Sequence, residues 1–399
     1  MAGVTLPDAD WQHRAGLTKL IRVLDDVRFV GGCVRDTLLG IPVSDVDLAT
    51  SLPPEKVVEY LKEAGITAVP TGIAHGTVTA VIESGPVEVT TLRRDVSTDG
   101  RHATVAFTDD WREDAARRDF TMNALYADPN TRAITDYFGG LDDLEARHVR
   151  FIGDPYARIA EDHLRILRFF RFLARFGDEP DAAALEACSA RANDLMALSR
   201  ERIRDELLKL LVAKDAVPVL RLMIERRILV PVLPEIVSAD ALAQLITREE
   251  GADVPGDRFR RLAALLPRDP SIGDAVASRL KLSKAEKKRL TLALTDRIGS
   301  PYEDAYRVGL EAATDRALLV FDPFDAVMAA RHLQQWDVPR FPLTGGAIVA
   351  RGIKAGPEVA RLLRAIEDRW VAENFPDSAR VDQIAEELVG APLRSNSSE

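Results

Sequence analysis

The sequence predicts an α+β protein in which a small mixed-sheet domain comes first and a long helical part follows. Short apolar runs, turns and glycines alternate up to about residue 92, as they do in strands joined by turns. From about residue 181 onward, apolar residues recur at helical spacing, and the segments break at glycine or proline. A chain of 399 residues is also long for a single core, so several subdomains are expected.

The first stretch with chemical meaning is 28–50, which reads RFVGGCVRDTLLGIPVSDVDLAT. Gly31 and Gly32 precede a short helical segment, and bare backbone N–H groups at such a point bind anions. Asp45 and Asp47 fall on the next expected strand, where residues i and i+2 share a face. Two crowded carboxylates stay ionised when a cation lies between them, and Mg²⁺ is usually held by one or two carboxylates plus substrate phosphates. Either motif alone is commonly a plain turn or a solvated loop, but together they indicate nucleotidyl transfer.

The next elements are a helix ended by Gly65 and a set of strands over 66–92, with a hairpin at Ser84-Gly85-Pro86. Glu88 lies on the second strand of this hairpin. It is either a third metal-binding carboxylate or an ordinary solvent-facing side chain, and the sequence favours neither. The polar, turn-rich run 93–110 is expected to be a mobile loop.

A charged cluster follows at 113–125, EDAARRDFTMNAL. Its apolar residues recur at helical spacing and are expected to pack inward, which leaves Arg118, Asp119 and Asn123 on the other sides. The cluster offers a cation for a triphosphate and acceptors for ribose hydroxyls. A purely structural network of ion pairs is the alternative.

Residues 161–175, EDHLRILRFFRFLAR, are expected to form one mostly buried helix because they are apolar nearly all round. Four arginines share one face at steps of three, three and four, namely Arg165, Arg168, Arg171 and Arg175. Buried guanidinium groups need carboxylates or phosphates as partners. Asp162 precedes Arg165 by three residues and is placed on the same face.

An aspartate beside an arginine has a specific use in recognising bases. Cytosine and adenine each present an amino donor next to a ring-nitrogen acceptor, whereas uracil and guanine present the reverse order. Asp162 accepting and Arg165 donating would match C and A and leave unpaired polar groups against U and G, at roughly 1–3 kcal/mol each. The alternative is an ion pair internal to the helix.

Composition limits the class of protein. The net charge of −10 argues against a surface that is generally basic, so nucleic-acid binding would need a local basic region. Only Cys33 and Cys188 occur, which excludes a disulfide framework or a cysteine-based zinc site. The N-terminus lacks the pattern of a signal peptide, and no apolar run reaches the roughly 20 residues that cross a bilayer. A cytoplasmic protein without membrane association is expected.

Three motifs, GGxVRDxLLG…DxDLAT, RRDFTxNAL and EDxLRxLRxxRF, resemble in order and spacing the signatures of a nucleotidyltransferase superfamily. It contains the bacterial-type (class II) tRNA CCA-adding enzymes and the bacterial poly(A) polymerases. The resemblance covers essentially the whole chain and is strongest over 28–175. It implies Mg²⁺ on Asp45 and Asp47, the base on Asp162 and Arg165, and the ribose on Asp119. It further implies a triphosphate site or supporting roles for Gly31, Gly32, Arg35, Arg118, Asn123, Arg168 and Arg171.

The resemblance also implies an organisation and an activity. A catalytic head would span 1–150, a helical neck 151–213, a helical body 214–300 and an RNA-binding helical tail 301–399. The expected reaction adds C, C and A to the tRNA 3′ end from CTP and ATP and releases pyrophosphate.

The run Asp95, Asp99, Gly100 and Arg101 is similar to a flexible loop of the complete CCA-adding enzymes. It therefore favours full CCA addition over an enzyme that adds only part of the sequence. A bacterial poly(A) polymerase is the main alternative. A catalytically idle RNA-binding relative is another, which the intact Asp pair disfavours.

Overall fold

The computed structural model describes residues 4–99, 102–296 and 299–390. The prediction for Gly100 and Arg101 therefore lies outside the described residues. The chain divides into two compact units, Met1–Ser238 and Ala239–Glu399. The finer boundaries of head, neck, body and tail stay predictions. In the part of the chain that the structure describes, no helix is both long and apolar enough to cross a membrane.

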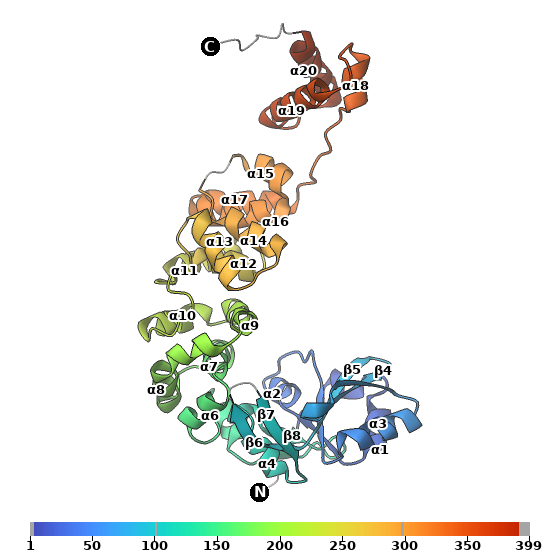
Figure 1. Ribbon diagram of the computed structural model, residues 1–399, viewed down its shortest axis with the longest axis vertical. Coiled ribbons are helices and arrows are strands. Elements are labelled where there is room, and N and C mark those ends of the chain that lie inside the picture. The colour runs from blue at the N-terminus through green and yellow to red at the C-terminus, as the bar shows by residue number, and fades with distance from the viewer. Residues whose placement is uncertain (1–3, 100–101, 297–298, 391–399) are drawn as a thin grey trace. The chain divides into compact units, whose positions relative to one another are not determined.

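A seven-stranded sheet forms the centre of the first unit (Figure 1). All neighbouring strands are antiparallel except one parallel pair, β2 with β5, which confirms a mixed sheet. The hairpin expected near Ser84 is confirmed, since Ile82 pairs with Gly85. The strands, in spatial order, are β3 (Thr67–Gly72), β4 (Thr77–Ile82), β5 (Gly85–Thr91), β2 (Asp47–Thr50), β1 (Val27–Val30), β8 (Leu125–Ala127) and β9 (Ile134–Asp136).

Side chains of β5 alternate between a buried and an exposed face of the sheet. Val87 and Val89 are buried whereas Glu88 is exposed, so the valines and Glu88 point to opposite faces. Two amphipathic helices, α1 (Leu17–Leu24) and α3 (Pro54–Glu63), pack against this edge of the sheet (Figure 1). Glu88 is directly opposite Asp47 in the β2–β5 register, so both carboxylates lie on one face.

The run expected to be a loop contains a two-stranded antiparallel ribbon, β6 (Arg93–Asp99) and β7 (His102–Phe107). Pairing runs from Arg93 with Phe107 to Asp99 with His102. The sequence predicted a loop because the run 93–110 is polar and rich in turn-forming residues. The valine, threonine and phenylalanine of 102–107 instead favour an extended chain, and the Asp-Gly step is typical of a hairpin turn.

Helices follow the sheet in the first unit, and one predicted helix is shorter than expected. Residues 161–175 do not form a single helix, because α6 ends at Glu161 and α7 begins at Arg165. Asp162 is extended (φ −150°, ψ 108°), and its carboxylate accepts the backbone N–H of Leu164 at 3.1 Å. This local bond competes with the helix. The helices are α2 (Gly32–Leu38), α4 (Trp111–Ala116), α5 (Gly140–Glu145), α6 (Pro155–Glu161), α7 (Arg165–Phe176), α8 (Ala182–Ala190), α9 (Arg200–Leu211) and α10 (Ala216–Glu225).

Stacked aromatic rings join α7 to the sheet region. The ring of Phe120, which precedes β8, lies 4.9 Å from the rings of both Phe151 and Phe172. Phe151 also stacks on Phe169. These rings are buried, and such aromatic pairs stabilise by about 0.5–1.5 kcal/mol beyond the area they bury. The packing fixes α7 beside the residues that precede β8.

The second unit is helical in its described part, as predicted. Trp370 is its largest buried side chain and packs with Leu362, Ile366 and Ile384. The helices are α11 (Asp240–Ala252), α12 (Arg258–Ala264), α13 (Pro270–Arg279), α14 (Lys284–Ala293), α15 (Pro301–Val308), α16 (Leu310–Val320), α17 (Pro323–Gln334), α18 (Gly345–Ala350), α19 (Pro357–Ala372) and α20 (Ser378–Gly390).

Candidate active site

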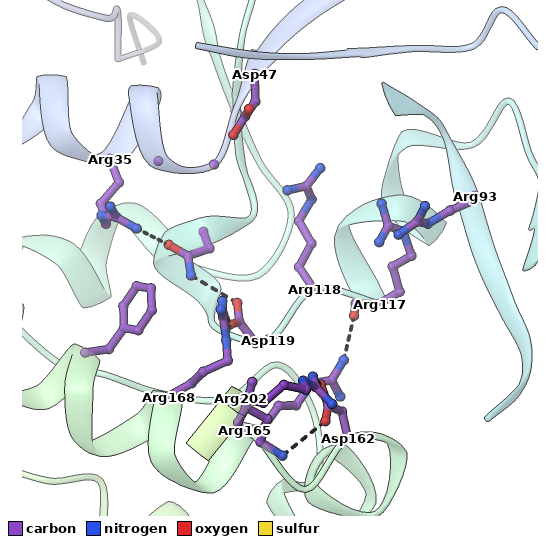
Figure 2. Close-up of a pocket in the computed structure, with 15 residues that line it drawn as sticks. Arg35, Asp47, Arg93, Arg117, Arg118, Asp119, Asp162, Arg165, Arg168 and Arg202 are labelled. Atoms are coloured by element: carbon purple, nitrogen blue, oxygen red, sulfur yellow. Dashed lines mark hydrogen bonds and ion pairs between the residues drawn. The ribbon is translucent and has the colours of Figure 1, made fainter. Parts of the chain in front are cut away.

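A cavity of about 500 Å³ lies in the first unit, where the sheet meets α7 and α9 (Figure 2). Seven arginines and three aspartates line it. In a chain of net charge −10, this is the local basic region that nucleic-acid chemistry requires. Its lining consists of Gly31, Gly32, Arg35, Asp47, Arg93, Arg117, Arg118, Asp119, Asn123, Asp162, Leu164, Arg165, Arg168, Phe172 and Arg202.

The glycine turn and the first helix form one wall. Gly31 has φ 73° and ψ −122°, and a Cβ atom there would lie 3.5 Å from Nη1 of Arg118. The positive φ favours glycine here, whereas the contact with Arg118 would be an ordinary van der Waals one. Arg35 is buried and donates to Oδ1 of Asn123 at 2.5 Å and to Asp36 at 2.7 Å. Its guanidinium lies 4.4 Å from the ring of Phe176.

The carboxylates predicted to bind metal lie at the start of β2. Asp47 lines the cavity and points toward Arg118 (Figure 2). The prediction that Asp45 and Asp47 fall on the same strand is wrong, because β2 begins only at Asp47 and Asp45 lies two residues before it. Asp45 is exposed and accepts the hydroxyl of Ser44 at 2.7 Å. Burial raises the pKa of Asp47 to about 6, with further increases from the charges of Glu88 and Asp45 and an opposing effect of Arg118. These interactions indicate that the three carboxylates are neighbours. Among the described residues, however, no group of three or more histidine, cysteine or acidic side chains has the geometry to hold a metal ion.

Asp114 on α4 holds two arginines of the cavity. It is buried and accepts from Arg117 at 2.7 Å, Arg118 at 3.2 Å and the hydroxyl of Tyr126 at 2.6 Å. Burial alone would raise the pKa of Asp114, but the two guanidinium groups and the hydroxyl hold it at about 2. We did not predict Asp114 or Arg117 as site residues. Both residues stand in the charged run EDAARRD, and this is the sequence feature that could have indicated them.

Asp119 and Asn123 continue this network. Asp119 is buried and accepts from Nε of Arg168 at 2.7 Å and from the Asn123 amide at 3.0 Å. Burial opposes ionisation, yet Arg168 and these hydrogen bonds hold the pKa of Asp119 at about 2. The expected helical spacing of 113–125 is not observed, because α4 ends at Ala116 and a 3-10 turn spans Thr121–Asn123. The predicted residues still converge on the cavity.

Asp162 and Arg165 both line the cavity, but they are not paired with each other in the structure. Asp162 accepts from Nη2 of Arg202 on α9 at 2.7 Å. Arg165 pairs with Glu161 and donates to the carbonyl groups of Arg158 at 2.8 Å and Arg117 at 3.1 Å. The predicted common helical face is wrong because α7 begins only at Arg165.

Of the remaining arginines, Arg171 lies elsewhere, with its Nε 2.5 Å from Glu206, beside a second cavity. Five residues that line the first cavity were not predicted. Arg93 and Arg117 belong to the runs 93–110 and 113–125. Leu164 and Phe172 are apolar residues of the run 161–175, which was expected to be mostly buried, and Arg202 comes from the segment ERIRDELLKLL.

A mixed sheet with a glycine turn, neighbouring carboxylates on the adjoining strand and an arginine-lined cavity defines a nucleotidyltransferase. Comparison with known proteins supports this class. Residues 27–150 match the family described as "Poly A polymerase head domain", and residues 179–240 match "Probable RNA and SrmB- binding site of polymerase A".

Two relatives illustrate the similarity. The chain is 35% identical to the mitochondrial CCA tRNA nucleotidyltransferase 1 of Homo sapiens, over 90% of this chain and 86% of that protein. It is 30% identical to the CCA-adding enzyme of Limosilactobacillus fermentum, over 92% of this chain and 94% of that enzyme. The chain therefore belongs to the family of CCA-adding tRNA nucleotidyltransferases, as the three motifs led us to expect.

Solved structures agree. The Bacillus stearothermophilus CCA-adding enzyme in complex with CTP superposes with a TM-score of 0.73 at 27% identity, covering 92% of this chain and 96% of that one. The Thermotoga maritima CCA-adding enzyme complexed with tRNA_CCA gives a TM-score of 0.68 at 19% identity, with 96% of each chain covered. The second likeness supports the fold.

Proposed function

We propose that this chain adds C, C and A to the 3′ end of tRNA from CTP and ATP, with release of pyrophosphate, and that the arginine-lined cavity binds the incoming nucleotide. The observation that carries the proposal is the layout of the cavity. Asp47 lies at one end, Asp162, Arg165 and Arg202 gather at the other, and Arg118 lies between (Figure 2). This order matches a nucleotide whose phosphates face the carboxylates and whose base faces Asp162.

The triphosphate needs cations that are already oriented. Arg118 is fixed by Asp114 and Tyr126, and Arg168 by Asp119. Held guanidinium groups bind phosphate oxygens with little further ordering. Gly31 and Gly32 let the phosphates approach the backbone, while Arg35 supports this wall through Asn123. Asn123 and Asp119 are proposed to face the ribose.

The carboxylates fit Mg²⁺, which prefers oxygen ligands and shares them with substrate phosphates. Asp45 and Asp47 would hold the ion, and Glu88, in register with Asp47, would support it from the same face. These carboxylates would hold an ion that, when bound, would supply activation of the RNA 3′-hydroxyl and neutralisation of charge on the reacting phosphate. Asp47 would thus hold the ion at the end of the cavity opposite to Asp162.

Base selection is proposed to depend on Asp162 and Arg165. An ionised carboxylate has about four acceptor positions and a guanidinium has five donors. Asp162 uses two positions for Arg202 and the N–H of Leu164, so capacity remains for the amino group of C or A. Arg165 makes three hydrogen bonds to the protein and retains donors for the ring nitrogen.

The test is to incubate the enzyme with Mg²⁺ and a tRNA that lacks its terminal CCA, with CTP, ATP or both, and to measure product length. Two residues from CTP alone and three from both nucleotides, without a long tail, are the expected results. Long A tails would assign the chain to poly(A) polymerases. An arrest after two residues in the presence of ATP would identify an enzyme that adds only CC.

A further inference from the structure

A second cavity, of about 440 Å³, lies in the first unit beside the C-terminal half of α7. Four of its six lining residues are cations and none is acidic. The lining consists of Arg171 and Arg175 on α7, Lys209 on α9, and Val212, Ala213 and Lys214 after α9.

The two arginines of this cavity are held in place. Arg171 pairs with Glu206 at 2.5 Å and stacks 4.5 Å from the ring of Phe172. Arg175 reaches Asp36 at 3.5 Å and stacks 4.8 Å from the ring of Phe176. Their planar groups are therefore preset, as they are in sites that bind phosphate.

The two lysines are different. Lys209 and Lys214 are exposed, and over the described ranges neither ammonium group has a hydrogen bond or an ion pair within the protein. The charges of Arg171 and Arg175 are compensated by Glu206 and Asp36, whereas the like charges of the two lysines have no acidic partner among the described residues and repel each other. The chain has ten more acidic than basic groups, yet no acidic residue is among the described residues that line this cavity. The cavity therefore favours binding of an external anion.

We propose that this second cavity binds phosphate groups of the tRNA strand whose 3′ end is extended. The inference rests on the proposed function and adds to it the position of part of the RNA. A single helix lines both cavities: Arg168 faces the first and Arg175 the second. These residues are seven positions apart, about 10 Å along α7, a span that one RNA strand bridges.

The lining favours an RNA backbone over a second nucleotide. A nucleotide site needs groups that read a base or ribose, such as the aspartates, Asn123 and Phe172 of the first cavity. Apart from its cations, the second cavity offers only Val212 and Ala213. Contact through cations alone is independent of sequence, which suits an enzyme that acts on tRNAs of different sequence.

The test compares the double variant Lys209→Ala/Lys214→Ala with Lys19→Ala/Lys62→Ala, which removes two exposed lysines from α1 and α3 of the same unit. Steady-state kinetics would use tRNA lacking CCA at several salt concentrations. We expect the first variant to raise KM for tRNA on the order of tenfold, and to reduce the slope of log KM against log salt by about one per contact removed. The kcat and KM for CTP should not change, and the control variant should match the wild type.

Each outcome has a defined meaning. An unchanged KM for tRNA and an unchanged salt slope, in a variant that still transfers nucleotides, would overturn this inference alone. A rise in KM for CTP with KM for tRNA unchanged would also overturn it, because the cavity would then serve a nucleotide or free pyrophosphate. If the wild type transfers nothing to tRNA, the proposed function itself is wrong.

Discussion

Arg202 holds Asp162: its Nη2 atom lies 2.7 Å from Oδ2 of Asp162, although 40 residues separate the two in the sequence. The pair is partly buried in the cavity, with side chains 29% exposed each. The other oxygen of Asp162 accepts the N–H of Leu164. The carboxylate proposed to read the base is thus oriented by α9, outside the motif that contains it.

Replacing Arg202 should therefore weaken base selection. In Arg202→Ala the Asp162 carboxylate keeps one fixed bond and gains freedom to rotate. Loss of one oriented hydrogen bond, about 1 kcal/mol or more, should lower the ratio of kcat/KM for CTP to that for UTP by about fivefold to tenfold. Arg204→Ala, on the same helix, is the matched control. A ratio that is unchanged, or that falls equally in the control, would contradict the role of Arg202.

Asp114 should be essential for the two arginines that it holds. In Asp114→Asn the cations of Arg117 and Arg118 lose their shared counter-charge, so their mutual repulsion is no longer compensated. Removing one partner of a buried ion pair costs about 3–5 kcal/mol of stability, which urea unfolding would measure. We also expect KM for both CTP and ATP to rise, because Arg118 is no longer fixed.

Tyr126→Phe is the control for that experiment. It removes the hydroxyl bonded to Asp114 at 2.6 Å but keeps the ring and the carboxylate. The hydroxyl also accepts from Nε of Arg118 at 3.2 Å, so the loss should be close to that of two hydrogen bonds, roughly 1 kcal/mol each. Because Asp114 still pairs with Arg118 in this variant, KM for the nucleotides should rise less than in Asp114→Asn. A normal KM for nucleotides in Asp114→Asn would show that Arg118 does not depend on Asp114.

Sequence alone located the parts of the site that local geometry determines. The glycine pair Gly31 and Gly32 lies at the start of a helix, and Asp47 begins a strand, because turns and short strands are properties of short segments. The strand was expected to include Asp45, but it begins two residues later. The break between Glu161 and Arg165 was missed because apolar periodicity continues across it. The helix is interrupted where the backbone N–H of Leu164 donates to the carboxylate of Asp162, and the apolar pattern does not reveal this bond. Arg202 was missed because its partner lies on another helix.

The acidic residues of the network should make the fold sensitive to acid. The pKa of Asp114 and that of Asp119 are about 2 in the folded chain, below the ordinary 3.8. A carboxylate with a lowered pKa stabilises the fold fully above its unfolded pKa, and this contribution is lost as the pH falls toward its folded pKa. Each should contribute roughly 2 kcal/mol near neutral pH.

The free energy of unfolding should therefore decrease between about pH 5 and pH 2. Asp119→Asn removes one of the two contributions, so its unfolding free energy should vary less over this interval. Urea titrations of both proteins at several pH values would measure the difference. Parallel curves for the two proteins would show that Asp119 does not have a lowered pKa.

The carboxylates at the start of β2 should be separable by their dependence on metal. Asp47→Asn removes the carboxylate that lies in the cavity, so transfer should be abolished while tRNA binding stays near that of the wild type. Asp45→Ala should behave in the same way. Glu88→Gln removes the carboxylate that faces Asp47 across the register. Since Glu88 is proposed to support the ion from outside the cavity, transfer should fall tenfold or more at low Mg²⁺ and recover as Mg²⁺ is raised.

Glu83→Gln is the control for Glu88, because Glu83 is also exposed and lies at the turn between β4 and β5. It should behave as the wild type at every Mg²⁺ concentration. Wild-type transfer by Glu88→Gln at low Mg²⁺ would show that Glu88 only faces solvent. Transfer by Asp47→Asn near the wild-type rate would contradict the proposed metal site, because Asp47 is the proposed metal ligand that lines the cavity. Retained tRNA binding in the inactive variants is what separates loss of the metal from loss of the fold.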